Sequence, residues 1–146
     1  MIQRKSICRQ WTFGKAVKDP RARISKLLDE PIEELDQDWE WVVSDVCRFR
    51  EYLRLYSLAY LDDQERSILM EMMLQCVNDV KAEFGFMPKF WLEVKVILIR
   101  DFRFLRKTVG YWGGISHFAL PINSWAISKE MKKVYWHCIN RRASLR

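Results

Sequence analysis

The stretch that decides the fold is DQDWEWVVSDVCRFREYLRLY, residues 36–56. In and around it, apolar side chains recur at alternating steps of three and four, the spacing that places them on one face of an α-helix. Pro31 suits the first turn of such a helix, because the N–H that proline lacks would be unpaired there. The pattern therefore predicts one long helix over residues 31–60, whose apolar face is Ile32, Leu35, Trp39, Val42, Val46, Phe49, Leu53, Tyr56 and Tyr60.

Trp41, Tyr52 and Leu55 lie off that face and form a second stripe of the same helix with Arg48. Two interpretations remain open. Another helix could cover the second stripe, which would make the 31–60 helix central. Otherwise the stripe is exposed, and its aromatic and arginine side chains are of the kind enriched at the binding hot spots of interfaces.

Three further helices are predicted over residues 62–84, 88–109 and 128–141. Asp62 and Glu65 have the spacing of a capping box at the start of the first of these. The short connection before it implies that this helix folds back antiparallel on the 31–60 helix. Together these elements predict an all-α bundle of four main helices in a single domain, residues 1–146.

The helix predicted over residues 88–109 has a competing interpretation. Its segment 93–100, EVKVILIR, is rich in β-branched residues and could form a strand. The helical spacing persists for nearly the whole segment and favours a helix. Because Leu92, Val96, Ile97 and Ile99 make its first half apolar nearly all round, we expect this helix to be central and buried.

The charges are distributed unevenly. Residues 1–28 carry eight Lys/Arg and one acid, whereas residues 29–45 carry eight acids and no Lys or Arg. The basic segment 1–28 is the least periodic part of the chain, although residues 20–28, PRARISKLL, could form a short helix. The opposite charges either pair with each other inside the protein or form a surface field that steers a charged partner.

The composition and the motifs limit where the protein can reside and which chemical functions it can have. No apolar run approaches the ~18 residues of a membrane span, and no export signal is evident, so we expect a cytoplasmic protein with free, buried thiols at its four cysteines. His117 and His137 fall in no catalytic or metal-binding motif. The acids Asp36, Asp38 and Glu40 are typical of a solvated helix face. We therefore expect no enzyme activity, no metal and no cofactor.

A basic row supports an alternative function. Arg100, Arg103 and Lys107 recur at i, i+3 and i+7 and could follow the phosphates of a nucleic acid. The acidic stretch 29–45 would repel such a ligand, and no known DNA- or RNA-binding motif is present. Nucleic-acid binding is therefore the second hypothesis, and an obligate homodimer with a structural role is the third.

The chain resembles the small helical immunity proteins of bacterial polymorphic-toxin systems. The resemblance rests on DVCRFREYLRLYSLAYLDDQERSILMEMMLQCVND (45–79), TVGYW (108–112) and WAISKEMKKVYW (125–136). It implies a cytosolic protein that binds a cognate toxin and blocks it by steric occlusion. The basic balance departs from the acidic surface expected of an inhibitor of a nuclease toxin. The predicted partner-contacting residues are Trp41, Arg48, Tyr52, Leu55, Glu33, Glu34, Asp38, Trp112 and Trp136.

Overall fold

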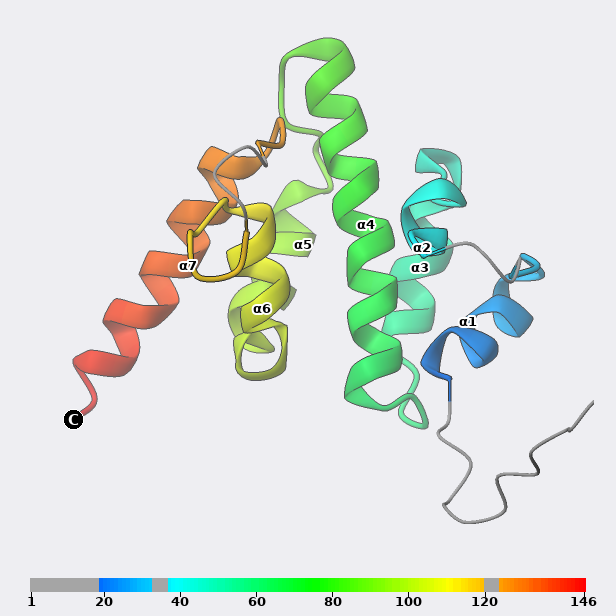
Figure 1. The fold of residues 1–146 in the computed structure, drawn as a ribbon, viewed down its shortest axis with the longest axis horizontal. Coiled ribbons are helices and arrows are strands. Elements are labelled where there is room, and N and C mark those ends of the chain that lie inside the picture. The colour runs from blue at the N-terminus through cyan, green and yellow to red at the C-terminus, as the bar shows by residue number, and fades with distance from the viewer. Residues whose placement is uncertain (1–18, 33–36, 120–123) are drawn as a thin grey trace, which may run out of the picture.

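The computed structural model describes residues 19–32, 37–119 and 124–146, and every regular element in these ranges is a helix. The predicted all-α class is confirmed. Figure 1 shows the long helix α4 (Asp63–Phe84) between two groups of helices, with α1, α2 and α3 on one side and α5, α6 and α7 on the other. The basic segment 1–28 can be followed only from residue 19 onward, because residues 1–18 lie outside the described residues.

The short helix expected over residues 20–28 is present as α1 (Pro20–Leu28). It begins with proline in its first turn, and the Asp19 carboxylate caps it by accepting a hydrogen bond from the Arg21 N–H at 3.0 Å. Its inward side chains, Ile24 and Leu28, are buried against α4.

The single helix predicted over residues 31–60 is wrong. The described part of this segment is α2 (Trp39–Val42), a 3-10 turn η1 (Val46–Arg48) and α3 (Phe49–Tyr56). The chain breaks where two short polar side chains compete for backbone groups. The Ser44 hydroxyl donates to the Trp41 carbonyl at 3.0 Å, and the Asp45 carboxylate caps η1 by accepting from the Cys47 N–H at 2.8 Å.

Both stripes of this segment contribute to the core. Tyr52 and Leu55 of the second stripe are buried on α3. Trp39 on α2 and Phe49 on α3, both of the first stripe, are also buried, whereas Val42 of the first stripe is 70% exposed. Both α2 and α3 pack against α4. The interpretation in which another helix covers the second stripe is therefore confirmed at Tyr52 and Leu55.

α4 matches the predicted helix 62–84. The capping box is present, because the Asp62 carboxylate accepts from the Glu65 N–H at 2.8 Å and the Glu65 carboxylate accepts from the Asp62 N–H at 3.0 Å. Gly85 ends the helix with φ 78°, a left-handed conformation that suits glycine. Since α1, α2, α3, α5 and α6 all contact α4, the central helix is this one and not the helix predicted over 88–109.

The helix predicted over residues 88–109 is divided into α5 (Trp91–Arg100) and α6 (Phe102–Trp112). The division lies at Asp101, whose carboxylate accepts from the Tyr56 hydroxyl at 2.7 Å and from the Arg100 guanidinium. The competing strand is excluded, because residues 93–100 are helical. The expectation of burial on all sides is wrong for α5: Leu92 is 70% and Val96 is 64% exposed.

The last predicted helix, 128–141, is confirmed as α7 (Ser128–Ala143). It packs mainly on α6 and also contacts α5, and it buries Met131, Val134, Tyr135 and Cys138. The expectation of buried thiols holds for Cys76 and Cys138, whereas Cys47 is exposed and Cys8 lies outside the described residues. Burial raises the pKa of the Cys76 thiol to about 12, so this thiol stays protonated at neutral pH.

Gly110 lies inside α6 rather than at its end, and it leads to a prediction. A methyl group at this position would overlap the ring of Phe118, which folds back over α6. We expect Gly110→Ala to lower the free energy of unfolding by about 1–3 kcal/mol through overpacking, although alanine favours helices by about 1 kcal/mol. In a Phe118→Ala background the same change should become stabilising. Urea unfolding of the four proteins measures both effects, and an equal cost in both backgrounds would rule out the Phe118 overlap as the cause.

Candidate functional site

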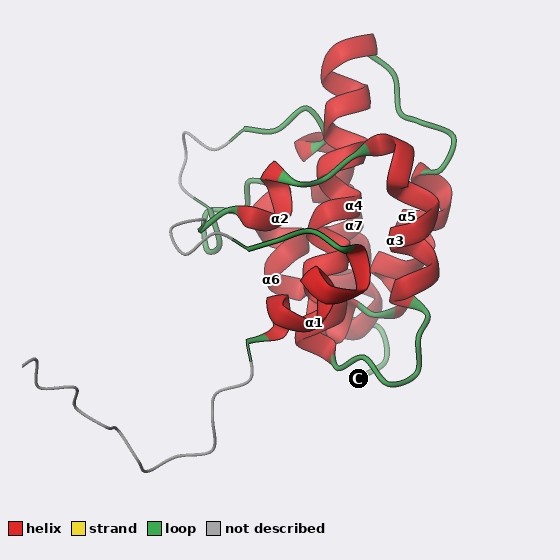
Figure 2. Ribbon diagram, turned by 90° about the vertical axis from the view of Figure 1, so that its right-hand side faces the viewer, coloured by secondary structure: helices red, strands yellow, loops and turns green. Residues whose placement is uncertain are grey.

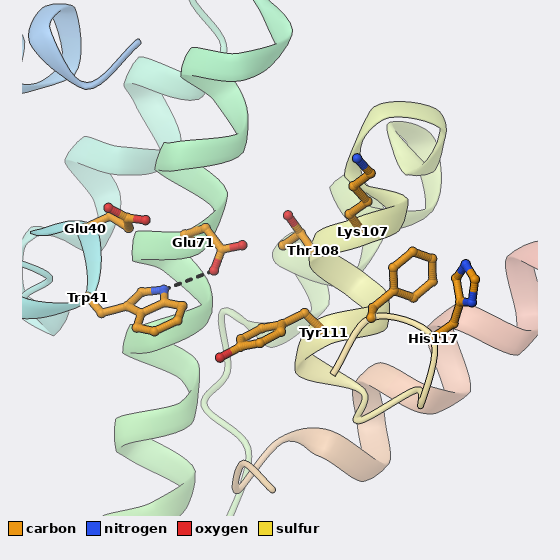
Figure 3. A pocket seen from close by; sticks show the side chains of 8 residues that line it. Glu40, Trp41, Glu71, Lys107, Thr108, Tyr111 and His117 are labelled. Atoms are coloured by element: carbon orange, nitrogen blue, oxygen red, sulfur yellow. Dashed lines mark hydrogen bonds between the residues drawn. The ribbon is translucent and has the colours of Figure 1, made fainter. Parts of the chain in front are cut away.

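A cavity of about 540 Å³ lies where α2, α4 and α6 meet the turn after α6. Figure 3 shows side chains from all four segments around it. The cavity brings together two carboxylates and several rings that are far apart in the sequence. Its lining residues are Glu40, Trp41, Glu71, Lys107, Thr108, Tyr111, His117 and Phe118.

Glu71 is the central polar group of the cavity. Its Oε2 accepts hydrogen bonds from Trp112 Nε1 at 2.6 Å and from Trp41 Nε1 at 3.1 Å, and the Thr108 side chain also hydrogen-bonds to it. Burial raises the pKa of the Glu71 carboxyl, the three hydrogen bonds lower it, and the nearby Glu40 carboxylate raises it further. The net direction is upward, so burial outweighs the hydrogen bonds.

Aromatic rings form one wall of the cavity and support it from behind. Trp41 stacks on Tyr111 with ring centroids 5.9 Å apart, and Trp112 and Trp125 lie at 6.0 and 6.1 Å from Trp41. Burial raises the pKa of the Tyr111 hydroxyl, and the charges of Glu71 and Asp38 raise it further. The Tyr111 hydroxyl is therefore neutral at physiological pH, and the formal negative charge of the site comes from its carboxylates.

The site differs from the solvated acidic face that the sequence suggests for Glu40. This side chain is partly buried at the cavity, whereas Asp38 beside it is exposed. Lys107 and His117 are exposed at the rim. Paired carboxylates next to aromatic faces favour a positively charged ligand over an anionic one.

The other predicted partner-contacting residues are distributed differently. Tyr52, Leu55 and Trp112 are buried, at 0%, 2% and 0% exposure, so their prediction as contacts for a partner is wrong. Arg48 is also occupied inside the chain, because its guanidinium bonds to Glu30, Glu51 and the Leu28 carbonyl. Of the remaining predictions, Trp136 is 48% exposed, while Glu33 and Glu34 lie outside the described residues.

The basic row predicted for nucleic acid lies along neighbouring cavities. Arg100 and Arg103 line a second cavity of about 330 Å³ with Arg141 and Arg142 of α7, and Arg103 and Lys107 together line a third of about 440 Å³. The Arg100 guanidinium is bound to Asp101, with Nη2 and Oδ2 2.6 Å apart. The structure therefore keeps part of the row and adds two arginines that the spacing within one helix could not reveal.

Sequence reasoning missed Glu71 and Tyr111. A signal for Glu71 is present in ILMEMML (68–74), where a single acid interrupts an apolar run of a helix. An acid at such a position is costly unless polar groups meet it. Its donors come from α2 and α6, and the helical pattern of α4 alone does not name them.

Two kinds of feature are absent from the described residues. They contain no group of three or more His, Cys, Asp or Glu side chains arranged to hold a metal ion. Within the same residues, no helix combines the length and the apolar character needed to cross a bilayer. No protein-family model, curated protein or solved structure matches this chain.

Proposed function

We propose that this chain is a non-enzymatic protein-binding protein, and that it serves as an immunity factor that neutralises a cognate toxin by covering its working site. The observation that carries the proposal is the cavity at Trp41, which combines aromatic walls with the carboxyl groups of Glu40 and Glu71. Aromatic anchors in pockets are where binding energy concentrates in protein interfaces. The resemblance to immunity proteins supports the choice of a toxin as the partner.

The test of the immunity function is to express the product of the neighbouring gene with and without this chain. We expect the neighbouring product to stop growth alone and the two proteins to form a complex when expressed together. A neighbouring product that is harmless, or that is toxic but forms no complex, argues against an immunity role. Protein binding in general is then tested by tagged capture from the native host at moderate salt after nuclease treatment.

Trp41→Ala is expected to weaken the complex about 30-fold or more, which corresponds to the ~2 kcal/mol of a hot-spot residue. The reason is that the partly buried indole forms part of the cavity wall. Binding is measured by calorimetry under conditions where urea unfolding shows the variant to be folded. The matched control is Val96→Ala, because the Val96 side chain is exposed on α5. In the view of Figure 2, α5 lies on the opposite side of α4 from α2 and α6, which line the cavity. Equal affinities of the Trp41→Ala and Val96→Ala proteins would remove the cavity from the interface.

A second candidate function, nucleic-acid binding, is favoured by one observation. Residues 100–146 carry ten Lys/Arg and two acids, and both acids already pair with basic residues, Asp101 with Arg100 and Glu130 with Lys81. The logarithm of nucleic-acid affinity should fall with log salt, by about 0.9 per duplex phosphate neutralised. Affinity for a partner anchored at Trp41 should change much less, so a salt titration separates the two functions.

The homodimer reading has its own test. The exposed Leu92 and Val96 lie one turn apart on α5 and form an apolar strip that a second copy could cover. If the protein is a homodimer through this strip, Val96→Lys should convert it to a monomer in solution scattering, while the cavity variants should not change its size.

A further inference from the structure

Glu71 lacks the kind of partner that the other sheltered carboxylates have. Glu65 pairs with Arg23, Glu51 with Arg48, Asp101 with Arg100 and Glu130 with Lys81, each within 3.9 Å. Within the described residues, the ion pairs include none to Glu71, whose donors are two indoles and a hydroxyl. These four carboxylates thus each pair with a cationic side chain, whereas Glu71 has no such partner among the described residues.

The space beside Glu71 suits a flat cation. The cavity of about 540 Å³ is within the size range of ligand pockets, ~300–1,000 Å³. The rings of Trp41 and Tyr111 both line the cavity. Figure 3 shows Glu40 near Trp41, and Glu71 between Trp41 and Tyr111. A guanidinium can stack on such rings and at the same time donate two parallel hydrogen bonds to a carboxylate. An ammonium is more strongly hydrated and is a point charge without the planar fork.

We propose that this cavity receives the guanidinium group of an arginine side chain from the partner protein, between Glu71, Glu40 and the rings of Trp41 and Tyr111. This inference rests on the proposed protein-binding function and names the chemistry of that contact. It also fits the charge of the lining, in which two carboxylates face one lysine. Lys107 is exposed at the rim, and Figure 3 shows its side chain pointing away from Glu71.

Binding of the cation should strengthen as the pH rises through the pKa of Glu71, because only the ionised carboxylate attracts it. The titratable and charged groups facing Glu71 are Glu40 from α2, Lys107 and Tyr111 from α6, and His117 from the following turn. Glu71→Gln and His117→Gln, titrated separately, show which group carries the dependence.

The experiment uses Nα-acetyl-L-arginine amide as the probe and ¹H–¹⁵N spectra of the seven indole N–H groups as the readout. Trp41→Phe and Trp112→Phe assign the two indoles that donate to Glu71. We expect these two resonances to shift with a dissociation constant on the order of millimolar, as for other ligands of this size. The neutral isostere Nα-acetyl-L-citrulline amide should shift them at least tenfold less.

Matched variants complete the test. Glu71→Gln and Glu40→Gln should each weaken the probe at least tenfold, whereas Glu83→Gln, an exposed acid near the end of α4, should not. Equal binding of the arginine and citrulline probes, or undiminished binding to Glu71→Gln, overturns the inference. Tighter binding of putrescine than of the arginine probe also overturns it, because the cavity would then select a free diamine.

The failures of the two proposals are distinguishable. A complex that is lost in Trp41→Ala but retained in Glu71→Gln and Glu40→Gln keeps the protein-binding function and removes the arginine from it. A probe that binds as expected while no protein complex forms refutes the protein-binding function and, with it, the assignment of the arginine to a partner.

Discussion

Trp112→Ala should lower the free energy of unfolding by about 3–5 kcal/mol, the range for truncating a buried tryptophan. The Trp112 side chain has no exposure, and its ring lies 5.1 Å from that of Trp125 and 6.0 Å from that of Trp41. Its indole also donates the shorter of the two hydrogen bonds to Glu71. Since domains of this size are stable by only about 5–15 kcal/mol, this loss is a large part of the total.

Urea unfolding followed by circular dichroism measures the effect. Trp112→Phe keeps a ring in the core but removes the indole donor, so it should cost less than alanine and separates packing from hydrogen bonding. Trp136→Ala is the matched control, because this exposed tryptophan should change stability by no more than about 0.5 kcal/mol. Similar costs for Trp112→Ala and Trp136→Ala would contradict the core position of Trp112.

The sequence predicts α4 well because this helix carries its own start and stop signals. α4 begins at the Asp62–Glu65 capping box and ends at Gly85, and these signals act within a few residues of chain. The helix predicted over residues 31–60 breaks at Ser44 and Asp45. Serine and aspartate can occur inside a helix, but their side chains can also hydrogen-bond to the backbone and cap a helix end. The apolar spacing continues through the break, so periodicity alone does not reveal it.

The division at Asp101 has a tertiary origin. Its carboxylate is held by the Tyr56 hydroxyl of α3, 45 residues earlier in the chain. No local feature of residues 88–109 indicates that contact. The exposure of Leu92 and Val96 also has a tertiary origin. The fold places α4 at the centre instead of α5, and the apolar residues around α5 do not indicate this.

For the candidate site, the sequence points to Trp41 but not to its surroundings. An aromatic side chain off the main stripe can be recognised from the pattern of one helix. The cavity also requires Glu71 from α4 and Tyr111 from α6, which that pattern does not reveal. Tyr52 and Leu55 produce the same signal as Trp41 and are buried. Helical spacing therefore identifies side chains that need a neighbour, and the fold determines whether that neighbour is another helix or a cavity.

Glu71→Gln should raise the free energy of unfolding at neutral pH and flatten its pH dependence above pH 4.5. Burial is the largest influence on Glu71 and raises its pKa above the ordinary value of 4.5 in the folded chain. Between these two pKa values, the native state holds a proton that the unfolded chain has released. The free energy of unfolding therefore falls as the pH rises through this window, by up to about 1.4 kcal/mol per pH unit. Glutamine cannot ionise, and its carbonyl oxygen can still accept from the indoles.

The measurement is urea unfolding at a series of pH values for the wild type, Glu71→Gln and the surface control Glu83→Gln. Arginine partners lower the pKa of Asp101 and Glu51, so their contribution is lost as the pH falls below the ordinary carboxyl range. Both groups remain in the variant, and the difference between the variant and the wild type isolates Glu71. A wild type that is more stable than Glu71→Gln at neutral pH would mean that the indole and hydroxyl donors outweigh burial. In that case Glu71 would be satisfied by the fold itself, and the reason to expect a cation from outside would disappear.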